Sequence, residues 1–294
     1  MHDINFTHEH ELKDHDFLGC CKDCQASLDI IKPHIMAFAK RIKKYTPKIL
    51  AALKPNDLYQ LYQLLDDLAH METGVRLAGL ILNEPDIRRK LPLIRSYYST
   101  FFSIHEKHLA EELLKSDSPL ETLKSFPLYP RYESLVRSQI EAVHTTSGST
   151  LVFVGCGAVP ITLILMSQLY GIRSIGLDRS STTVILSKKV IQSLGLAKEV
   201  KIIHGDDSRL RELDWDMVLV AALAEPKARI FQTLRKVLKK RKGHVPVSFR
   251  TYTGMRAVLY EPVQPGDIAG FKIVKEILPT GRVNNTTVFA ELEE

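Results

Sequence analysis

The sequence is poor in the features that mark secreted and membrane-spanning proteins. It has four cysteines in 294 residues, three of them within Cys20–Cys24, so it offers no disulfide framework. No run approaches the ~20 uninterrupted apolar residues that a membrane helix needs. The opening residues are polar and rich in His and acidic side chains, unlike a signal peptide. We therefore expect a cytoplasmic protein with no membrane partner.

The sequence also has little excess charge. Lys and Arg number 40 and Asp and Glu number 34, giving a net charge of +6. The basic runs Lys40–Lys44 and Arg235–Lys242 are typical of solvated helix faces, and no aromatic residues alternate with the second run. We expect small-molecule substrates and no nucleic-acid partner. The oligomeric state stays open, with a homodimer as one option.

The N-terminal segment, residues 1–26, has poor periodicity and is interpreted as a polar tail. Cys21 and Cys24 stand two residues apart, with several His residues upstream, and these residue types ligate zinc. A structural zinc site needs a second pair at suitable spacing, and the sequence has none. We therefore predict no metal site here and none needed for catalysis.

Residues 27–146 are predicted to form an N-terminal helical domain. Leu58, Leu61, Leu64, Leu65 and Leu68 recur at three- and four-residue spacing, which is typical of an amphipathic helix. The segment Ile87–Lys115 repeats the pattern, and Ser118 precedes a proline and then an acidic residue, as at a helix start. The polar connection 144–149 marks the expected domain boundary.

Residues 147–294 alternate strand-like and helix-like segments. Strands are expected at 151–154, 174–177, 200–203, 217–222, 245–249, 271–278 and 288–292. Helices are expected at 161–170, 182–194 and 227–240. This order predicts an α/β, Rossmann-like domain: a mostly parallel, doubly wound sheet that ends in an antiparallel hairpin.

A glycine-rich loop follows the first expected strand. Gly155 and Gly157 stand at a helix N-terminus, where the backbone can approach a ligand closely. Position 160 is Pro160 rather than the third glycine of a dinucleotide fingerprint, which argues against a pyrophosphate cradle.

Acidic residues end the next two expected strands. Asp178 stands where a carboxylate can accept both hydroxyls of a ribose, and Asp206 and Asp207 stand where one can read an adenine amino group. A glycine turn followed by these acids is the layout of S-adenosylmethionine enzymes. The alternative is an ordinary strand–helix turn with surface acids, but three features in this order favour a nucleoside ligand.

The loop after the fourth strand, Ala221–Lys227, lies where open α/β sheets bind ligands. Its small side chains, including Ala222, leave room for a sulfonium or a substrate. Glu225 and Lys227 could contact charged ends of a ligand. Equally, Glu225 is an acid in the first turn of a helix beside a proline.

Two further groups combine arginine with tyrosine or asparagine. Arg250, Tyr252, Arg256 and Asn285 could hold substrate carboxylates through bidentate hydrogen bonds, or could belong to surface loops. The segment 126–132, which contains Tyr129, Arg131 and Tyr132, is too rich in aromatic residues and proline for a plain linker. Glu106 taken alone is typical of a solvated helix acid.

Several of these segments together resemble the nicotianamine synthase family, most closely its archaeal type, over roughly residues 55–292. The segments are Ser116–Leu123, Tyr129–Tyr132, Gly155–Thr162, Ala221–Lys227, Arg250–Arg256 and Val283–Thr286. The resemblance implies a helical bundle that caps a class I S-adenosylmethionine-dependent methyltransferase fold. Residues 1–50 lie outside it.

The resemblance also implies an activity. Members of this family transfer the 3-amino-3-carboxypropyl arm of S-adenosylmethionine, which is a substrate, to an amine and release methylthioadenosine. The products are metallophores such as nicotianamine, whereas related bacterial enzymes of opine-metallophore pathways alkylate histidine once. An ordinary methyltransferase is the remaining alternative.

The resemblance assigns roles to single residues. It implies that Glu106 and Tyr132 lie at the reacting amine, that Gly155 and Gly157 form the donor loop, and that Asp178 holds the ribose. Cys156 is a departure, because glycine is common at that position in the family.

Overall fold

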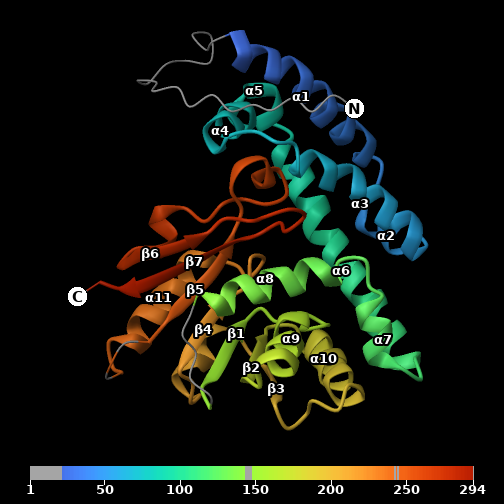
Figure 1. The fold of residues 1–294 in the computed structure, drawn as a ribbon. Helices are drawn as coiled ribbons and strands as arrows, with labels where there is room; N and C mark the ends of the chain where they lie inside the picture. Colours follow the sequence, from blue (N-terminus) through green and yellow to red (C-terminus); the bar gives the residue numbers. More distant parts are fainter. Residues whose placement is uncertain (1–21, 143–147, 242, 244, 294) are drawn as a thin grey trace. The chain divides into compact units, whose positions relative to one another are not determined.

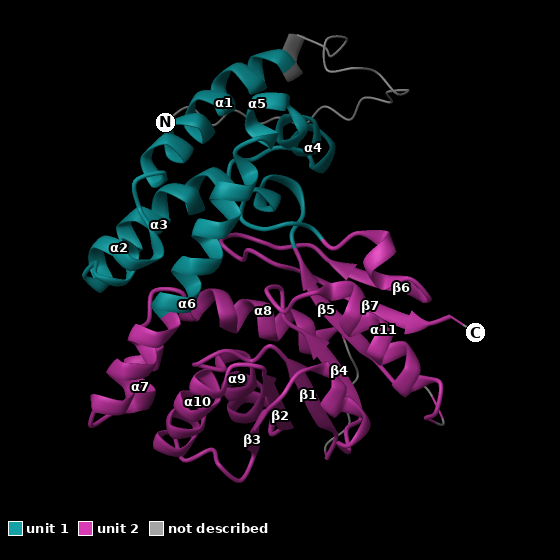
Figure 2. Cartoon of the chain, turned by 180° about the vertical axis from the view of Figure 1, so that it is seen from behind, with its two compact units in different colours: residues 1–105, 252–262 teal, residues 106–251, 263–294 magenta. Residues whose placement is uncertain are grey.

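The computed structural model describes residues 22–142, 148–241, 243 and 245–293 (Figure 1). The chain forms two compact units (Figure 2). The first, the helical unit, contains the described residues up to His105 together with Tyr252–Pro262. The second, the sheet unit, contains Glu106–Thr251 and the described residues from Val263 onward.

This division differs from the expected one at residue 146. Helix α8 (Tyr129–Glu141) belongs to the sheet unit, because it packs on helix α9 (Ile161–Tyr170) and buries Leu135 and Val136. The short helix η3 (Gly254–Val258) belongs to the helical unit, because it packs on α3 and α4. Both segments therefore group with the apolar surface that they cover.

The helical unit is built from consecutive helices and η3. They are α1 (Lys22–Ile42), α2 (Pro47–Ala51), α3 (Pro55–Ala69), α4 (Val75–Asn83), α5 (Pro85–Arg88) and the first part of α6 (Leu91–Lys115). Helix α1 begins at Lys22, so the last five residues of the expected tail are helical. The remainder of that tail, with Cys20 and Cys21, lies outside the described residues. A break after α5 moves the long helix start from the expected Ile87 to Leu91.

The core of the helical unit confirms the leucine pattern. Leu58 and Leu65 are fully buried, while Leu64 is 40% exposed and lies at the edge of the apolar stripe. Tyr62 stacks on Phe101 of α6, with ring centroids 4.3 Å apart and an interplanar angle of 6°. Apolar burial and aromatic stacking thus join α3 to α6.

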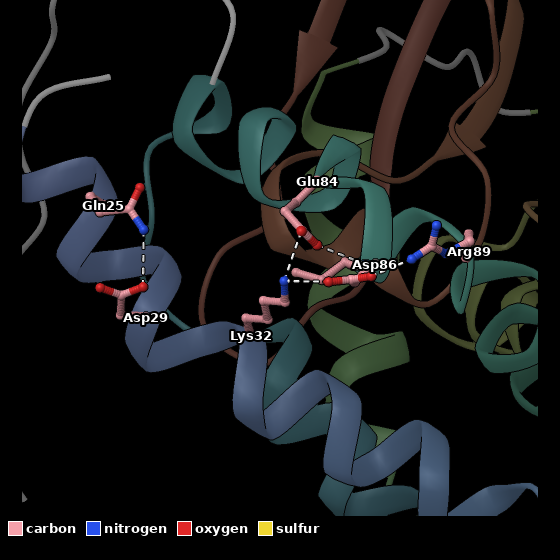
Figure 3. Close-up of polar contacts among 7 residues, drawn as sticks. Gln25, Asp29, Lys32, Glu84, Asp86 and Arg89 are labelled. Atoms are coloured by element: carbon pink, nitrogen blue, oxygen red, sulfur yellow. Dashed lines mark hydrogen bonds and ion pairs between the residues drawn. The ribbon is translucent and has the colours of Figure 1, made fainter. Parts of the chain in front are cut away.

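A polar cluster on this unit's surface joins α1 to the α4–α5 segment (Figure 3). Lys32 Nζ lies 2.8 Å from Glu84 Oε1 and 2.6 Å from Asp86 Oδ2, and Arg89 also pairs with Asp86. The Lys32 ammonium lowers the pKa of Asp86. The charges are mutually satisfied near solvent, so the cluster orients helices rather than forming a reactive site.

The sheet unit has the predicted topology. Its strands are β1 (Thr150–Val154), β2 (Arg173–Asp178), β3 (Val200–His204), β4 (Met217–Val220), β5 (Val247–Thr251), β6 (Phe271–Ile277) and β7 (Thr286–Leu292). They lie in the order β3-β2-β1-β4-β5-β7-β6. The first five strands pair in parallel, and β7 is antiparallel to both β5 and β6. The Rossmann-like methyltransferase fold and its terminal hairpin are therefore confirmed.

Helices cover both faces of this sheet. Besides α8 and α9, the unit contains α7 (Pro119–Lys124), α10 (Ser181–Ser193), α11 (Lys227–Leu238), η2 (Asp207–Arg211) and η4 (Pro265–Ile268). Residues 151–154 of β1 are buried without alternation, as expected for a strand covered on both faces. From α11, Phe231 packs edge-to-face on Phe249 and Phe271. Ligand access is therefore expected at the carboxyl ends of the strands.

Candidate active site

The glycine turn after β1 has the conformation of a loop whose backbone can approach a ligand closely. Gly155 and Gly157 have φ values of +83° and +76°, a region that residues with side chains rarely adopt. The N–H groups of Gly155 and Cys156 both donate to the carbonyl of Leu177, at 2.8 and 3.0 Å. The turn is therefore fixed to the end of β2, and Pro160 closes it immediately before α9.

The departure at Cys156 is accommodated by a glycine on the neighbouring strand. A Cβ on Gly176 would lie 2.9 Å from the Cys156 Sγ atom, so only glycine leaves room for this thiol. Burial raises the pKa of Cys156, which keeps the thiol neutral. The cysteine thus fills space beneath the turn and leaves its backbone geometry intact.

Two carboxylates accept hydrogen bonds from successive amides of this turn. The Gly157 N–H donates to Asp178 Oδ2 at 3.1 Å, and the Ala158 N–H donates to Glu106 Oε2 at 3.2 Å. Asp178 ends β2, and its other oxygen accepts from the Ser180 N–H at 2.9 Å. Three residues predicted from the sequence, Glu106, Gly157 and Asp178, therefore meet at one place.

The surroundings of Glu106 raise the pKa of its carboxyl. Desolvation is the main cause that raises its pKa from 4.5 to about 7, although the residue keeps some exposure. The Ala158 amide opposes this shift, and the negative charge of Asp178 adds to it. A carboxyl with this pKa exchanges a proton readily near neutral pH.

The raised pKa makes stability depend on pH. Between pH 4.5 and about 7 the folded protein keeps a proton on Glu106 that the unfolded chain has released. The free energy of unfolding therefore falls as pH rises through this window. The Glu106→Gln side chain cannot ionise, so the variant does not lose this stability as pH rises. We therefore expect the free energy of unfolding of the variant, relative to that of the parent, to be higher at pH 8 than at pH 5. Urea unfolding of both proteins at the two pH values measures this, and an unchanged difference would contradict it.

The two aspartates after β3 have different surroundings. Asp207 is 2% exposed, and its oxygens accept from Arg229 at 2.7 Å and from Thr233 at 2.6 Å, both on α11. Asp206 is partly exposed, accepts from the Ser208 N–H at 3.0 Å and lies 3.1 Å from Arg229. The hydrogen bonds from Ser208 are the main cause that lowers the pKa of Asp206, and the charge of Arg229 adds to it. Asp207 therefore anchors α11, and Asp206 remains the residue proposed to contact adenine.

The loop after β4 packs against the glycine turn. A Cβ on Gly155 would lie 2.8 Å from the Ala224 Cβ atom and 3.3 Å from that of Ala221. The carbonyl of Ala222 and the carboxylate of Glu225 both face inward to Lys227 Nζ, at 2.8 and 3.4 Å. The loop 221–225 therefore lies beside the glycine turn, and the Lys227 ammonium bonds within this loop, whereas its role in donor binding stays a prediction.

The aromatic segment predicted near the reacting amine begins helix α8. Tyr129, Arg131 and Tyr132 occupy its first turn, and all three are partly buried. Burial is the main cause of a raised pKa for Tyr129. These residues belong to the same unit as Glu106. Their roles towards a substrate stay predictions.

The predicted substrate-binding residues near β5 are divided between the units. Arg250 is buried in the sheet unit and donates to Thr162 Oγ1 at 2.9 Å and to Gln139 Oε1 at 3.2 Å. These bonds give its guanidinium an internal structural role that the sequence did not indicate. Tyr252 and Arg256 lie in the helical unit, where the Tyr252 hydroxyl is 3.2 Å from that of Tyr98.

Asn285 precedes β7 and has an unused hydrogen-bond donor. Its buried Nδ2 atom has no hydrogen-bond partner in the part of the chain that the structure describes. Such a buried amide gains stability when a ligand oxygen accepts from it. The substrate role of Asn285 stays a prediction.

Two structural roles were missed from the sequence. The sequence pattern suggests a ligand contact for Lys227 and indicates no role for Arg229, although Arg229 bridges Asp206 and Asp207. The first turn of α11 carries both residues. Both residues stand at the start of a helix that follows the expected ligand-binding edge of the sheet. This position is the sequence signal that could have indicated their structural roles.

None of the described helices combines the length and the apolarity of a membrane span. Within residues 22–142, 148–241 and 245–293, no three His, Cys, Asp or Glu side chains group in a way that could hold a metal ion.

Solved structures share this fold over most of the chain. A crystal structure of MtNAS in complex with MTA and tNA is 34% identical, has a TM-score of 0.83, and covers 94% of this chain and 100% of its own. A glutamate-to-glutamine variant of MtNAS in complex with S-adenosylmethionine is 34% identical with a TM-score of 0.81, again covering 94% of this chain and 100% of its own.

Sequence comparisons agree. Nicotianamine synthase 1 of Arabidopsis thaliana is 26% identical over 257 residues, 82% of this chain and 79% of the plant protein. L-histidine 2-aminobutanoyltransferase of Pseudomonas aeruginosa is 21% identical over 172 residues, 58% of this chain and 62% of the bacterial protein. The family model described as nicotianamine synthase protein matches residues 24–294, and the chain therefore belongs to the nicotianamine synthase family.

Proposed function

We propose that this enzyme transfers the 3-amino-3-carboxypropyl group of S-adenosylmethionine to an amine and releases methylthioadenosine. The observation that carries the proposal is the pair of carboxylates on successive amides of the glycine turn, Asp178 on Gly157 and Glu106 on Ala158. Asp178 would hold the donor ribose. Glu106 would then stand beside the bound donor, where a proton must be removed.

The reaction needs an uncharged nitrogen. An α-amino group has a pKa of about 8, so it is mostly protonated at neutral pH. A carboxyl with the ordinary pKa of 4.5 would be a poor acceptor for that proton, whereas Glu106 has a pKa of about 7. Proton transfer from the amine to Glu106 is therefore almost balanced, as efficient general-base catalysis requires.

The group transfer is then a direct displacement. The nitrogen lone pair forms a bond to the arm's carbon next to sulfur, and the carbon–sulfur bond breaks with its electron pair going to sulfur. The cationic sulfonium becomes a neutral thioether, methylthioadenosine, and Glu106 holds the proton released from nitrogen. Tyr132 is proposed to orient the amine. Three carbons are bonded to the sulfonium sulfur, and the carbon that faces the nitrogen is the one that reacts.

The acceptor defines the product. Nicotianamine-type chemistry, in which a second donor molecule supplies the amine, is the proposed reaction, in a metallophore pathway in the cytoplasm. The P. aeruginosa relative is named as a histidine aminobutanoyltransferase, so a single transfer to histidine is the second candidate. In both cases Arg131 and Asn285, which both belong to the sheet unit, are proposed to contact acceptor carboxylates.

Product analysis tests the proposed activity. Purified protein incubated with S-adenosylmethionine is expected to release methylthioadenosine. Mass spectrometry is expected to detect a product that is heavier than the acceptor by one or more aminocarboxypropyl groups. Parallel reactions with and without histidine assign the acceptor. Release of S-adenosylhomocysteine in place of methylthioadenosine would instead identify a methyltransferase. Asp178→Asn serves as a control for enzymatic turnover, because it weakens ribose binding.

A further inference from the structure

Lys227 forms an unusual polar site inside the sheet unit. The residue is 4% exposed, yet it carries an ammonium group at the start of α11. Its Nζ atom donates to the carbonyls of Ala222 at 2.8 Å and Ala224 at 2.5 Å, and lies 3.4 Å from Glu225 Oε1. An ammonium has three donors, and three acceptors surround this one.

Burying this charge is unfavourable unless the surrounding geometry is maintained. Desolvation lowers the pKa of Lys227, and the nearby carboxylates of Glu225 and Asp267 oppose that effect. Glu225 is itself held in place, because its Oε2 atom accepts from the Lys227 backbone N–H at 2.9 Å. The acceptors therefore have to stay close to Nζ, which restrains the loop that carries them.

The restrained loop contacts both sides of the donor site. Its Ala221 N–H donates to the carbonyl of Val154 at 3.0 Å, just before the glycine turn, and Ala224 lies against Gly155. Its Glu225 carbonyl accepts from Arg179 at 3.3 Å, the residue that follows Asp178. A shift of this loop would therefore displace both the turn and the ribose acid.

We propose that Lys227 is a positioning residue for the donor, acting by holding the loop 221–225 against the glycine turn. This inference rests on the proposed function, because it assumes that the glycine turn binds S-adenosylmethionine. Lys227 does not touch the donor, because its three donors are used within the loop. Its contribution is therefore expected in donor affinity rather than in the chemical step.

Lys227→Met tests this directly, with Lys236→Met as the matched control. Lys236 lies on the same helix and is exposed, so the control removes the same charge without touching the loop. Misplacing substrate-positioning groups by about 1 Å can cost on the order of 10²-fold in rate, and we take this figure as the upper limit for the loss of donor binding. We expect the dissociation constant for S-adenosylmethionine to rise between about 10- and 100-fold in Lys227→Met, with the control unchanged.

The measurements separate positioning from loss of folding. Isothermal titration gives the donor dissociation constant and the fraction of protein competent to bind, while steady-state kinetics gives the KM for donor and kcat. A positioning role raises the dissociation constant and KM together and changes kcat little. A purely structural role lowers the competent fraction and kcat with an unchanged dissociation constant, and this outcome would overturn the inference.

A second variant keeps the test decisive. Lys227→Gln retains two N–H donors on a shorter, neutral chain, so it is expected to weaken donor binding less than Lys227→Met does. If Lys227→Met does not fold, parental donor affinity in Lys227→Gln would overturn the inference. Failure of the parent protein to bind S-adenosylmethionine would instead reject the proposed function, so the two failures are distinguishable.

Discussion

Glu106→Gln is expected to lower kcat by about 10²- to 10⁴-fold, the usual contribution of a positioned general base. Glutamine keeps the shape of the side chain and can still accept from the Ala158 N–H through its carbonyl. The glycine turn therefore keeps its partner, and S-adenosylmethionine is expected to bind with an affinity close to that of the parent. The amine, however, has no carboxylate to receive its proton.

The control lies on the same helix. Glu111 is partly exposed and lies 4.0 Å from Lys107, so Glu111→Gln removes one acidic charge of α6 without touching the turn. Single-turnover measurements at pH 7 to 9 separate proton transfer from product release. A parental kcat in Glu106→Gln, with donor binding intact, would remove Glu106 from the catalytic step.

Gly157→Ala is expected to lower kcat/KM by on the order of 10²-fold or more. A displacement of catalytic groups by about 1 Å can lower the reaction rate by that factor. A Cβ at this position would lie 2.5 Å from Glu106 Oε2, so the carboxylate has to move. The φ of +76° adds backbone strain, about 1–3 kcal/mol for a residue other than glycine. The substitution therefore acts on both the donor turn and the proposed base.

Gly195→Ala isolates the backbone part of this effect. Gly195 has a φ of +72° and nothing within 4 Å of the position that a Cβ would occupy. Both variants are expected to lose similar stability in thermal unfolding, and only Gly157→Ala is expected to lose activity. Equal kcat/KM values in the two variants would show that the contact with Glu106 has no catalytic consequence.

Much of the sheet unit could be predicted from local sequence patterns. The β1 strand is a continuous apolar run, and helix α9 begins at the predicted Ile161. The strand β5 begins at Val247, two residues after the predicted Val245. Apolar runs show that a strand exists, but hydrogen bonds to β4 and β7 set its limits.

The division into units could not be predicted in the same way. Met255 and Val258 are buried because η3 packs on helices α3 and α4, which lie far away in the sequence. A sequence pattern contains no information on that partner. The helical pattern of the segment Glu106–Glu141 likewise predicts a place in the helical half, whereas the structure groups this segment with the sheet.

Glu106 shows how site chemistry depends on distant contacts. Its neighbours on α6 predict a solvated acid, and only the family resemblance indicated a catalytic role. The structure shows why it differs from a solvated acid, because its carboxylate accepts from an amide 52 residues further along the chain and is largely desolvated, although the residue keeps some exposure. Asp207 is similar, since its burial depends on Arg229, 22 residues away.

No continuous stretch of this polypeptide encodes the helical unit. The chain passes between the two units three times, within α6, after Thr251 and after Pro262. A truncated protein that ends at His105 would lack η3, and the surfaces of α3 and α4 that η3 covers would face water. Truncation at one point would therefore yield fragments that are prone to aggregate. To study either unit alone, a circular permutation or a grafted 252–262 loop would be needed.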